Sequence, residues 1–159
     1  MTWIAGITKG RRELEAQARL KNQGYEAYVP ICRVQKGKNK AEVLFPNYIF
    51  INIQFGEDAI SPIENTPCMS KLVRFGNNIP TVDEAVIDHL KIIAGDMKII
   101  ELENDFYSEG DVVRIKSGVL KFYEGVVQAK SRTDRVNVLL DLLGRQVVME
   151  LNTNEIESR

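Results

Sequence analysis

Residues 135–151, "RVNVLLDLLGRQVVMEL", fit two kinds of secondary structure equally well. In steps of two, one side of a half-buried strand carries Val136, Val138, Leu140 and Leu142. In steps of three and four, one helical stripe carries Val136, Leu139, Leu140, Leu143 and Val147. Most segments fit a single period, because a slipped pattern turns apolar side chains toward water. The stretch therefore raises the question of whether the chain adopts one of these structures or both.

The preceding residues can also be read in both ways. A second helical stripe carries Val119, Phe122, Tyr123 and Val126, and "SRTD" (131–134) would form the turn between two amphipathic helices. Such short helices need an apolar surface to lie on. Residues 110–159 also divide into four or five β-like segments, which predicts a small barrel instead. In that barrel Leu139 and Leu143 would point outward beside polar residues, which favours a second, helical fold. Of the glycines, only Gly125 is expected inside a helix, where it costs about 1 kcal/mol relative to alanine.

The composition is that of a globular protein. The chain has 159 residues, of which 44% are hydrophobic and 27% charged, enough for one core or two small ones. No apolar run approaches the roughly 20 residues of a membrane span, and no secretory signal is apparent, so we expect a cytoplasmic protein. The two cysteines, Cys32 and Cys68, lack C-x-x-C spacing and are expected to be free structural thiols.

Charge is distributed unevenly along the chain. Residues 1–40 hold nine Lys and Arg against three Glu, a local charge of +6, although the whole chain has a net charge of -1. This split favours an anionic partner, and a solvated basic face is the alternative. In a helix starting near Arg11, Arg12 and Arg19 would share one side with Gln23.

Residues 1–95 predict an α+β unit, with one antiparallel sheet and helices packed on it. Strands are expected at 2–9, 25–31, 43–55 and 71–75, helices at 10–24 and 83–95, and a short helix or turn at 56–65. In the strand "VLFPNYIFINIQF" (43–55), Tyr48 and Phe50 share one side with Asn52, while three isoleucines share the other. Thr81 and Glu84 form a T-x-x-E capping box before the second helix. The acidic, non-periodic residues 96–109 are interpreted as a linker.

Several fragments, in this order and spacing, resemble the NusG family of transcription elongation factors. They are "LFPNYIFINI" (44–53), "VRFG" (73–76), "GDVVRI" (110–115), "EGVV" (124–127) and "LLGR" (142–145). The leucine-rich "LLDLLGR" (139–145) is most similar to RfaH, the specialised paralogue within that family. The resemblance implies a NusG-type N-terminal domain (1–95) and a KOW-type C-terminal domain (110–159). The C-terminal domain would be a β-barrel or, when docked on the N-terminal domain, an α-helical hairpin.

The resemblance also implies partners. The clamp helices of the RNA polymerase largest subunit would bind an apolar patch made of Phe45, Tyr48, Phe50 and Phe75, for which the alternative is an ordinary core role. Non-template DNA at a pause element would bind Lys9, Arg11, Arg12, Arg19, Asn22 and Gln23. Residues 60–69, "ISPIENTPCM", depart from the RfaH pattern, because they lack its run of threonines and its Thr-Arg-Gly. A small-subunit ribosomal protein is the partner implied for the C-terminal domain.

In the docked form, the resemblance implies that the hairpin masks the polymerase site and inhibits the protein. The aromatic strand would supply the apolar surface that the two helices need. Interdomain contacts are expected from Phe122, Tyr123, Val126, Leu139, Leu140 and Leu143.

The hypothesis that the protein is an enzyme finds little support in the sequence. The one histidine, His89, is expected at a surface or half-buried helix position, and no nucleotide-binding or nucleophile-elbow motif occurs. We therefore expect no catalytic residue, cofactor or metal. The rival function is that of a KOW-containing RNA-binding or ribosome-associated protein without specificity for polymerase.

Overall fold

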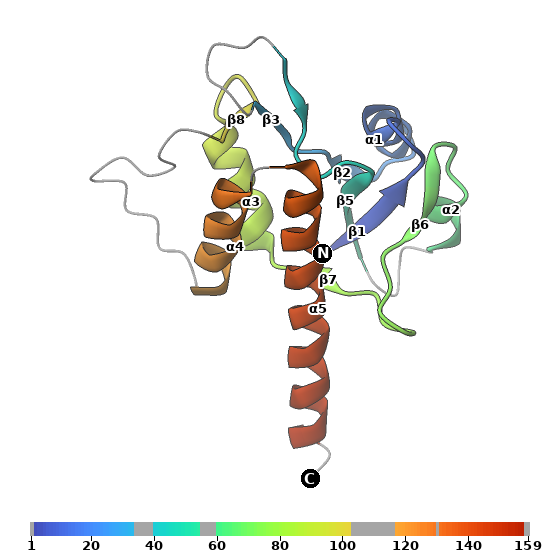
Figure 1. Cartoon of the computed structure of the whole chain (residues 1–159). Helices are drawn as coiled ribbons and strands as arrows, with labels where there is room; N and C mark the ends of the chain where they lie inside the picture. The colour runs from blue at the N-terminus through green and yellow to red at the C-terminus, as the bar shows by residue number, and fades with distance from the viewer. Residues whose placement is uncertain (1, 34–39, 55–59, 103–116, 130, 158–159) are drawn as a thin grey trace.

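Figure 1 shows the computed structural model of the chain, which describes residues 2–33, 40–54, 60–102, 117–129 and 131–157. The larger sheet has five strands in the order β2-β5-β1-β6, and β7 also pairs with β1. These strands are β1 (Thr2–Thr8), β2 (Glu26–Tyr28), β5 (Tyr48–Ile53), β6 (Met69–Leu72) and β7 (Thr81–Val82). Every pairing in this sheet is antiparallel. The predicted antiparallel sheet and flanking helices are confirmed.

A second sheet departs from the prediction of a single one. It consists of β3 (Ile31–Arg33), β4 (Glu42–Val43) and β8 (Ile100–Glu101), and β8 runs parallel to β3. Ile100 and Leu102 are buried, so the predicted linker 96–109 contains residues of the core after its exposed first residues. A two-residue strand beside acidic residues shows too little alternation to be recognised from sequence. Residues 103–109 lie outside the described part of the chain.

The two faces of β5 build two separate cores, as predicted. Ile49, Ile51 and Ile53 pack on one face with Ala16 and Leu20 of helix α1 (Glu13–Asn22). This core also contains Ile63 of the short helix α2 (Ser61–Glu64). Phe50 belongs to the core on the other face, and Tyr48 packs against that core. Alternation along one strand therefore sends aliphatic and aromatic side chains to opposite sides of the sheet.

Helix α3 (Glu84–Ala94) lies on the aromatic side and begins with a cap that differs from the predicted one. Asp83 is the N-cap, and its Oδ1 accepts a hydrogen bond of 3.0 Å from the backbone N–H of Ala85. Thr81 instead belongs to strand β7, where it pairs with Ile4 of β1. The predicted capping box is therefore wrong, because sheet pairing fixes Thr81 and leaves a second good capping residue next to the helix. Gly95 ends the helix with φ of 64°.

The described C-terminal residues form a hairpin of two helices, α4 (Ser117–Gln128) and α5 (Arg132–Glu157). Ser131 begins α5 by accepting a hydrogen bond of 3.1 Å from the N–H of Asp134. Gly144 lies inside α5, so the expectation that only Gly125 would fall within a helix is wrong. Figure 1 shows that the C-terminal part of α5 extends past the rest of the fold. Within the described ranges, no helix is long and apolar enough to span a membrane.

Candidate interaction surfaces

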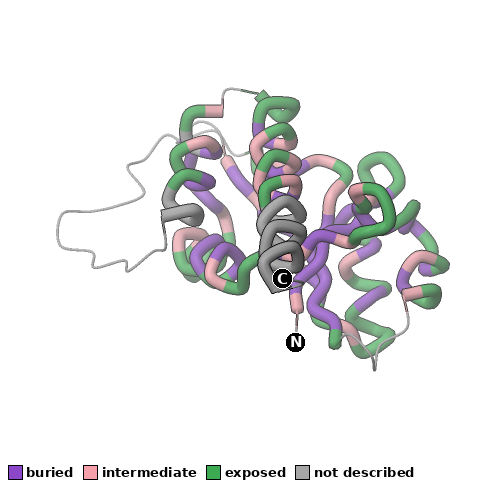
Figure 2. The backbone as a smooth tube through the Cα atoms, turned by 90° about the horizontal axis from the view of Figure 1, so that it is seen from below, coloured by how far each residue is buried: buried purple, intermediate pink, exposed green. Residues whose placement is uncertain are grey.

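The hairpin packs on the aromatic side of β5. Phe45 and Phe50 are each 1% exposed, and their rings meet edge to face with centroids 6.0 Å apart. Tyr48 and Phe75 are half-buried and pack against the same core. We call these four residues the aromatic patch. Figure 2, which is coloured by burial, shows buried stretches along the strands of the sheet and on parts of the helices beside it.

The hairpin contributes its own apolar residues to that core. Those that are buried are Phe122, Tyr123, Val126, Leu139 and Leu143, while Leu140 is half-buried. The Phe122 ring lies 6.0 Å from the Phe45 ring between centroids. Leu140 lines a groove of about 430 Å³ together with Tyr48 and Phe75. The structure thus brings together the residues predicted to bind polymerase and those predicted for the interdomain contact. The side chain of Val119 lies outside the described set.

Gly125 and Gly144 lie where the hairpin meets other side chains, but only Gly125 is needed for close packing. A Cβ atom at Gly125 would lie 3.1 Å from Cγ1 of Val138, so α4 and α5 approach each other tightly at this point. A Cβ atom at Gly144 would lie 4.0 Å from the Phe75 ring, which is an ordinary contact. The two positions therefore differ in the space available for a side chain.

A buried histidine lies where α4 meets α3. The hydroxyl of Tyr123 donates a hydrogen bond of 3.0 Å to the backbone carbonyl of Val86. The ring of His89 lies 4.1 Å from the Tyr123 ring between centroids. His89 is 4% exposed, so the predicted surface or half-buried position is wrong: the hairpin covers this face of α3. Burial lowers the pKa of His89 below its ordinary value.

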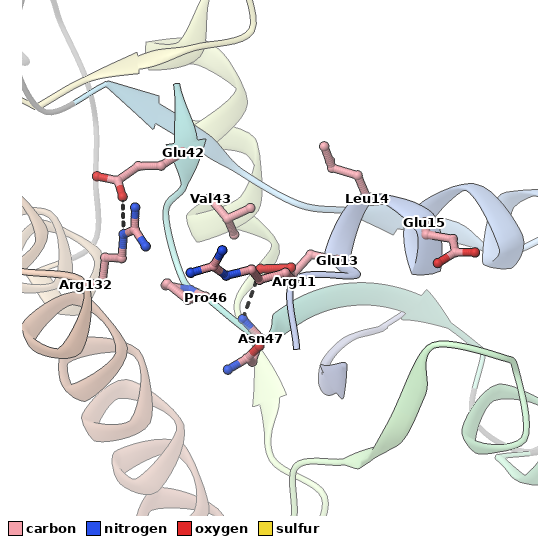
Figure 3. Close-up of a pocket in the computed structure, with 9 residues that line it drawn as sticks. All are labelled: Arg11, Glu13, Leu14, Glu15, Glu42, Val43, Pro46, Asn47 and Arg132. Carbon is pink, nitrogen blue, oxygen red and sulfur yellow. Dashed lines mark hydrogen bonds and ion pairs between the residues drawn. The ribbon is translucent and has the colours of Figure 1, made fainter. Parts of the chain in front are cut away.

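Charged residues at the start of α5 bind the edge of the second sheet. Arg135 is 1% exposed; its Nε donates a hydrogen bond of 2.9 Å to the Leu44 carbonyl, and its Nη2 lies 3.3 Å from Oε1 of Glu42. Arg132 forms a second ion pair with Glu42, which Figure 3 shows. This cluster was not predicted from the sequence. Its one signal was that Arg135 lies four residues before Leu139, on the same side of the helix.

A pocket of about 460 Å³ lies between this cluster and the beginning of α1 (Figure 3). It is lined by Arg11, Glu13, Leu14, Glu15, Glu42, Val43, Pro46, Asn47 and Arg132. Its acidic groups are already engaged. Glu13 accepts a hydrogen bond of 3.3 Å from the N–H of Asn47, Glu15 accepts one of 2.8 Å from the Cys68 thiol, and Glu42 pairs with the arginines of α5.

The predicted DNA-binding residues lie along and just before α1. Lys9, Arg11, Arg12 and Asn22 are exposed. Arg12 is the N-cap, so the helix begins slightly later than expected, and Arg11 has φ of 58°. Arg19 lies 3.2 Å from Glu15, which raises the pKa of Arg19. Gln23 donates a hydrogen bond of 2.9 Å to the Thr66 hydroxyl. Exposed cations therefore lie just before α1 and also in its last turn, where Arg19 is close in sequence to the amides of Asn22 and Gln23.

Metal and disulfide chemistry find no support in the described part of the chain. Cys32 and Cys68 are both buried and free, as the sequence predicted. Over the described residues, no three His, Cys, Asp or Glu side chains come together in a way that could hold a metal ion.

Comparison with known proteins gives one family. The family model described as "Transcription termination factor nusG" matches residues 1–91. The transcription termination/antitermination protein NusG of Staphylococcus aureus (strain NCTC 8325 / PS 47) is 28% identical over 130 residues, which cover 79% of this chain and 71% of that protein. The corresponding protein of Staphylococcus carnosus (strain TM300) is 27% identical over 124 residues, with coverages of 77% and 68%.

One similar solved structure is described as "Domain interaction in Thermotoga maritima NusG". This chain aligns to it with a TM-score of 0.45 and 17% sequence identity. That comparison covers 72% of this chain and 65% of the other, less than two thirds of its length. The family assignment therefore rests on the sequence comparisons. Because the family model matches more than half of the residues, the chain belongs to the NusG family of transcription termination factors.

Proposed function

We propose that this protein is a transcription elongation and antitermination factor that binds RNA polymerase through the aromatic patch. The observation that carries the proposal is the composition of the patch. Four aromatic residues belong to or pack against the core on one face of β5, and this core also includes Phe122, Leu139 and Leu143 of the hairpin. Aromatic side chains gathered at the centre of an apolar surface are the usual anchors of a protein interface. The clamp helices of the largest polymerase subunit are the partner that the family resemblance implies.

In this proposal the hairpin is an inhibitor that covers the patch. Phe122, Leu139 and Leu143 are buried in the same core as Phe45 and Phe50, so polymerase and hairpin would compete for one surface. Glu42, Arg132 and Arg135 add a charged contact at the edge of this surface. A factor that is masked in this way needs a signal for release, as in the RfaH type of the family.

That signal is proposed to be non-template DNA at a pause element. Lys9, Arg11 and Arg12 would contact phosphates, together with Arg19. The amides of Asn22 and Gln23 are groups that can read base edges. The basic charge of the first forty residues favours such an anionic partner.

The released C-terminal segment is proposed to refold as a KOW-type β-barrel. Leu139 and Leu143, which are buried in the hairpin, would then point outward from the barrel. A small-subunit ribosomal protein is the partner that the family resemblance implies for this form. Two packings of one sequence that differ by a few kcal/mol make such a switch possible. The period-two pattern of residues 136–142 supports the strand form.

The test of the polymerase assignment is co-purification. The tagged full chain, isolated from its cells, should bring RNA polymerase with it, and this recovery should rise for a chain ending at residue 102. Recovery of ribosomal RNA without polymerase from both chains would contradict the proposal. That result would favour the rival function, an RNA-binding or ribosome-associated protein without specificity for polymerase.

A further inference from the structure

We propose that the groove beside α5 binds a single-chain anionic amphiphile of the fatty-acid type, and that this ligand stabilises the docked hairpin. The groove has a volume of about 430 Å³. It lies where Leu140 of α5 meets the larger sheet, so one wall belongs to the hairpin and the other to the N-terminal part. Ligand binding depends only on the docked arrangement, whereas its effect on polymerase rests on the proposed masking function.

The register of the sheet builds one wall of the groove. Ile7 of β1 pairs with Tyr48 of β5 on one side and with Lys71 of β6 on the other. Residues that stand opposite each other in neighbouring strands point to the same face of a sheet, so these three side chains form a row on the aromatic side. The row passes from two half-buried apolar side chains to an exposed cation.

Phe75 and Leu140 complete the apolar lining. The N–H of Phe75 donates a hydrogen bond of 2.8 Å to the Asn78 carbonyl, and the N–H of Asn78 donates one of 3.1 Å in return, so a tight turn holds the Phe75 backbone beside the groove. Both side chains are half-buried. A hydrocarbon chain in the groove would therefore cover apolar surface that docking of the hairpin leaves partly open to water.

The charge of the groove favours an anion. The described residues that line it include two cations, Lys71 and Arg74, and no carboxylate. Arg74 is already engaged, because its Nη1 and Nη2 donate hydrogen bonds of 3.0 and 2.6 Å to the carboxylate of Glu64. Lys71 forms no ion pair with any described residue. Its ammonium is the group that can bind a ligand carboxylate at the edge of the sheet.

A ligand held between hairpin and sheet favours the docked state. When the hairpin leaves, Leu140 leaves with it, and the released protein lacks one wall of the groove. A ligand that binds one of two states more tightly shifts the equilibrium toward that state. At a ligand concentration about tenfold above Kd, the ratio of docked to released protein should rise by up to about tenfold. Under the proposed function, such a ligand would keep the aromatic patch masked.

The experiment is an NMR titration of the full chain with dodecanoate, below the concentration at which it forms micelles. The amide signals of Ile7, Tyr48, Lys71 and Phe75 report on the groove. We expect saturable shifts with a Kd of about 1 mM or below, the scale for a ligand of this size. Octanoate should bind at least about tenfold more weakly, because its shorter chain covers less apolar surface. Dodecyltrimethylammonium, which has the same chain and a cationic head, should bind at least about fivefold more weakly.

Two pairs of variants locate the site. Lys71→Glu is compared with Lys21→Glu, which makes the same change of charge on α1, on the other side of the sheet. Leu140→Ser is compared with Leu142→Ser, which makes the same change in α5 at a half-buried residue outside the groove. Lys71→Glu and Leu140→Ser should each weaken dodecanoate binding by at least about fivefold, and each control by less than about twofold. The amide signals of β5 check that every variant folds.

Hydrogen exchange measures the effect on docking. Dodecanoate at about ten times its Kd should slow the slowest-exchanging amides of α5 by up to about tenfold, because they open when the hairpin leaves. Unchanged exchange at saturation would overturn the inference. So would a lack of saturable shifts in the groove, or equal dodecanoate affinity of Lys71→Glu and Lys21→Glu. Polymerase is absent from this experiment, so its result is separate from failure of the proposed function.

Discussion

At the scale of single residues, the hairpin is held by one buried arginine more than by any exposed ion pair. Arg135 is almost fully buried, and removing its carboxylate partner would leave a charge in the interface with one backbone carbonyl. The ion pair of Arg145 with Asp141, also on α5, has side chains that are 61% and 60% exposed. Solvent screens such an exposed pair, which contributes little to stability.

Glu42→Gln should therefore weaken docking of the hairpin by about 1 to 3 kcal/mol, because it takes the negative charge away from the buried Arg135 at a partner that is itself only half-buried. The measurement is the docked fraction from α5 amide signals. Asp141→Asn is the matched control and should change docking by less than about 0.5 kcal/mol. Equal effects of the two substitutions would show that Arg135 does not depend on Glu42.

Tyr48 offers a cleaner test of the aromatic patch than Phe50 does. Phe50 is 1% exposed, and its replacement by alanine should destabilise the fold by about 3 to 5 kcal/mol. Tyr48 is half-buried, and Tyr48→Ala should weaken polymerase binding by more than about 1 kcal/mol in a chain with a released hairpin. Leu14→Ala, at an apolar residue that is 55% exposed on α1, serves as control. Unchanged affinity for Tyr48→Ala in a folded protein would remove the patch from the polymerase interface.

At the scale of elements, Gly125 of α4 and Gly144 of α5 should respond to substitution in opposite ways. Gly144→Ala adds a methyl group at ordinary contact distance from Phe75 and should stabilise α5 by about 0.5 to 1 kcal/mol. Gly125→Val places branched atoms against Val138, where even a Cβ lies at 3.1 Å, and should loosen the packing of α4 on α5. Thermal unfolding followed by circular dichroism at 222 nm compares the two variants. A lower midpoint for Gly144→Ala would contradict the packing described for α5.

Helix α1 carries the prediction about DNA. Arg19→Ala should weaken binding to single-stranded DNA and reduce the slope of log affinity against log salt by about one. Arg145→Ala, which removes an exposed cation from α5, is the control. An unchanged salt slope for Arg19→Ala would mean that the pairing of Arg19 with Glu15 keeps it from the phosphates.

Sequence patterns predicted the elements that have a clear period. The alternation in 48–53 gave both faces of β5, and the stripe at 139 and 143 agrees with the burial of both leucines. What could not be predicted depends on distant pairing. The strand β8 is two residues long, and its burial depends on β3, almost seventy residues earlier. His89 is buried where it meets Tyr123 of α4, thirty-four residues later, and Glu42 meets the arginines of α5 across ninety residues. Such contacts leave no local pattern.

At the scale of the whole molecule, one surface serves two proposed occupants. The hairpin covers the aromatic patch, and the sequence of α5 also has the period of a strand. Its apolar residues would lose their burial in the released state unless they found a new core. In the proposed function, a chain with these features acts only when a signal uncovers the patch.

Masking of the patch by the hairpin is tested by polymerase binding on a template that lacks any specific element. The wild-type chain is compared with Leu139→Ser/Leu143→Ser, in which two fully buried contacts of the hairpin are lost, and with Asp141→Asn as control. We predict that the double variant binds at least about tenfold more tightly than the wild type, since two buried leucines contribute several kcal/mol to docking, while the control binds like the wild type. Equal affinity of the wild type and the double variant, with the hairpin shown by NMR to be released in the latter, would contradict masking.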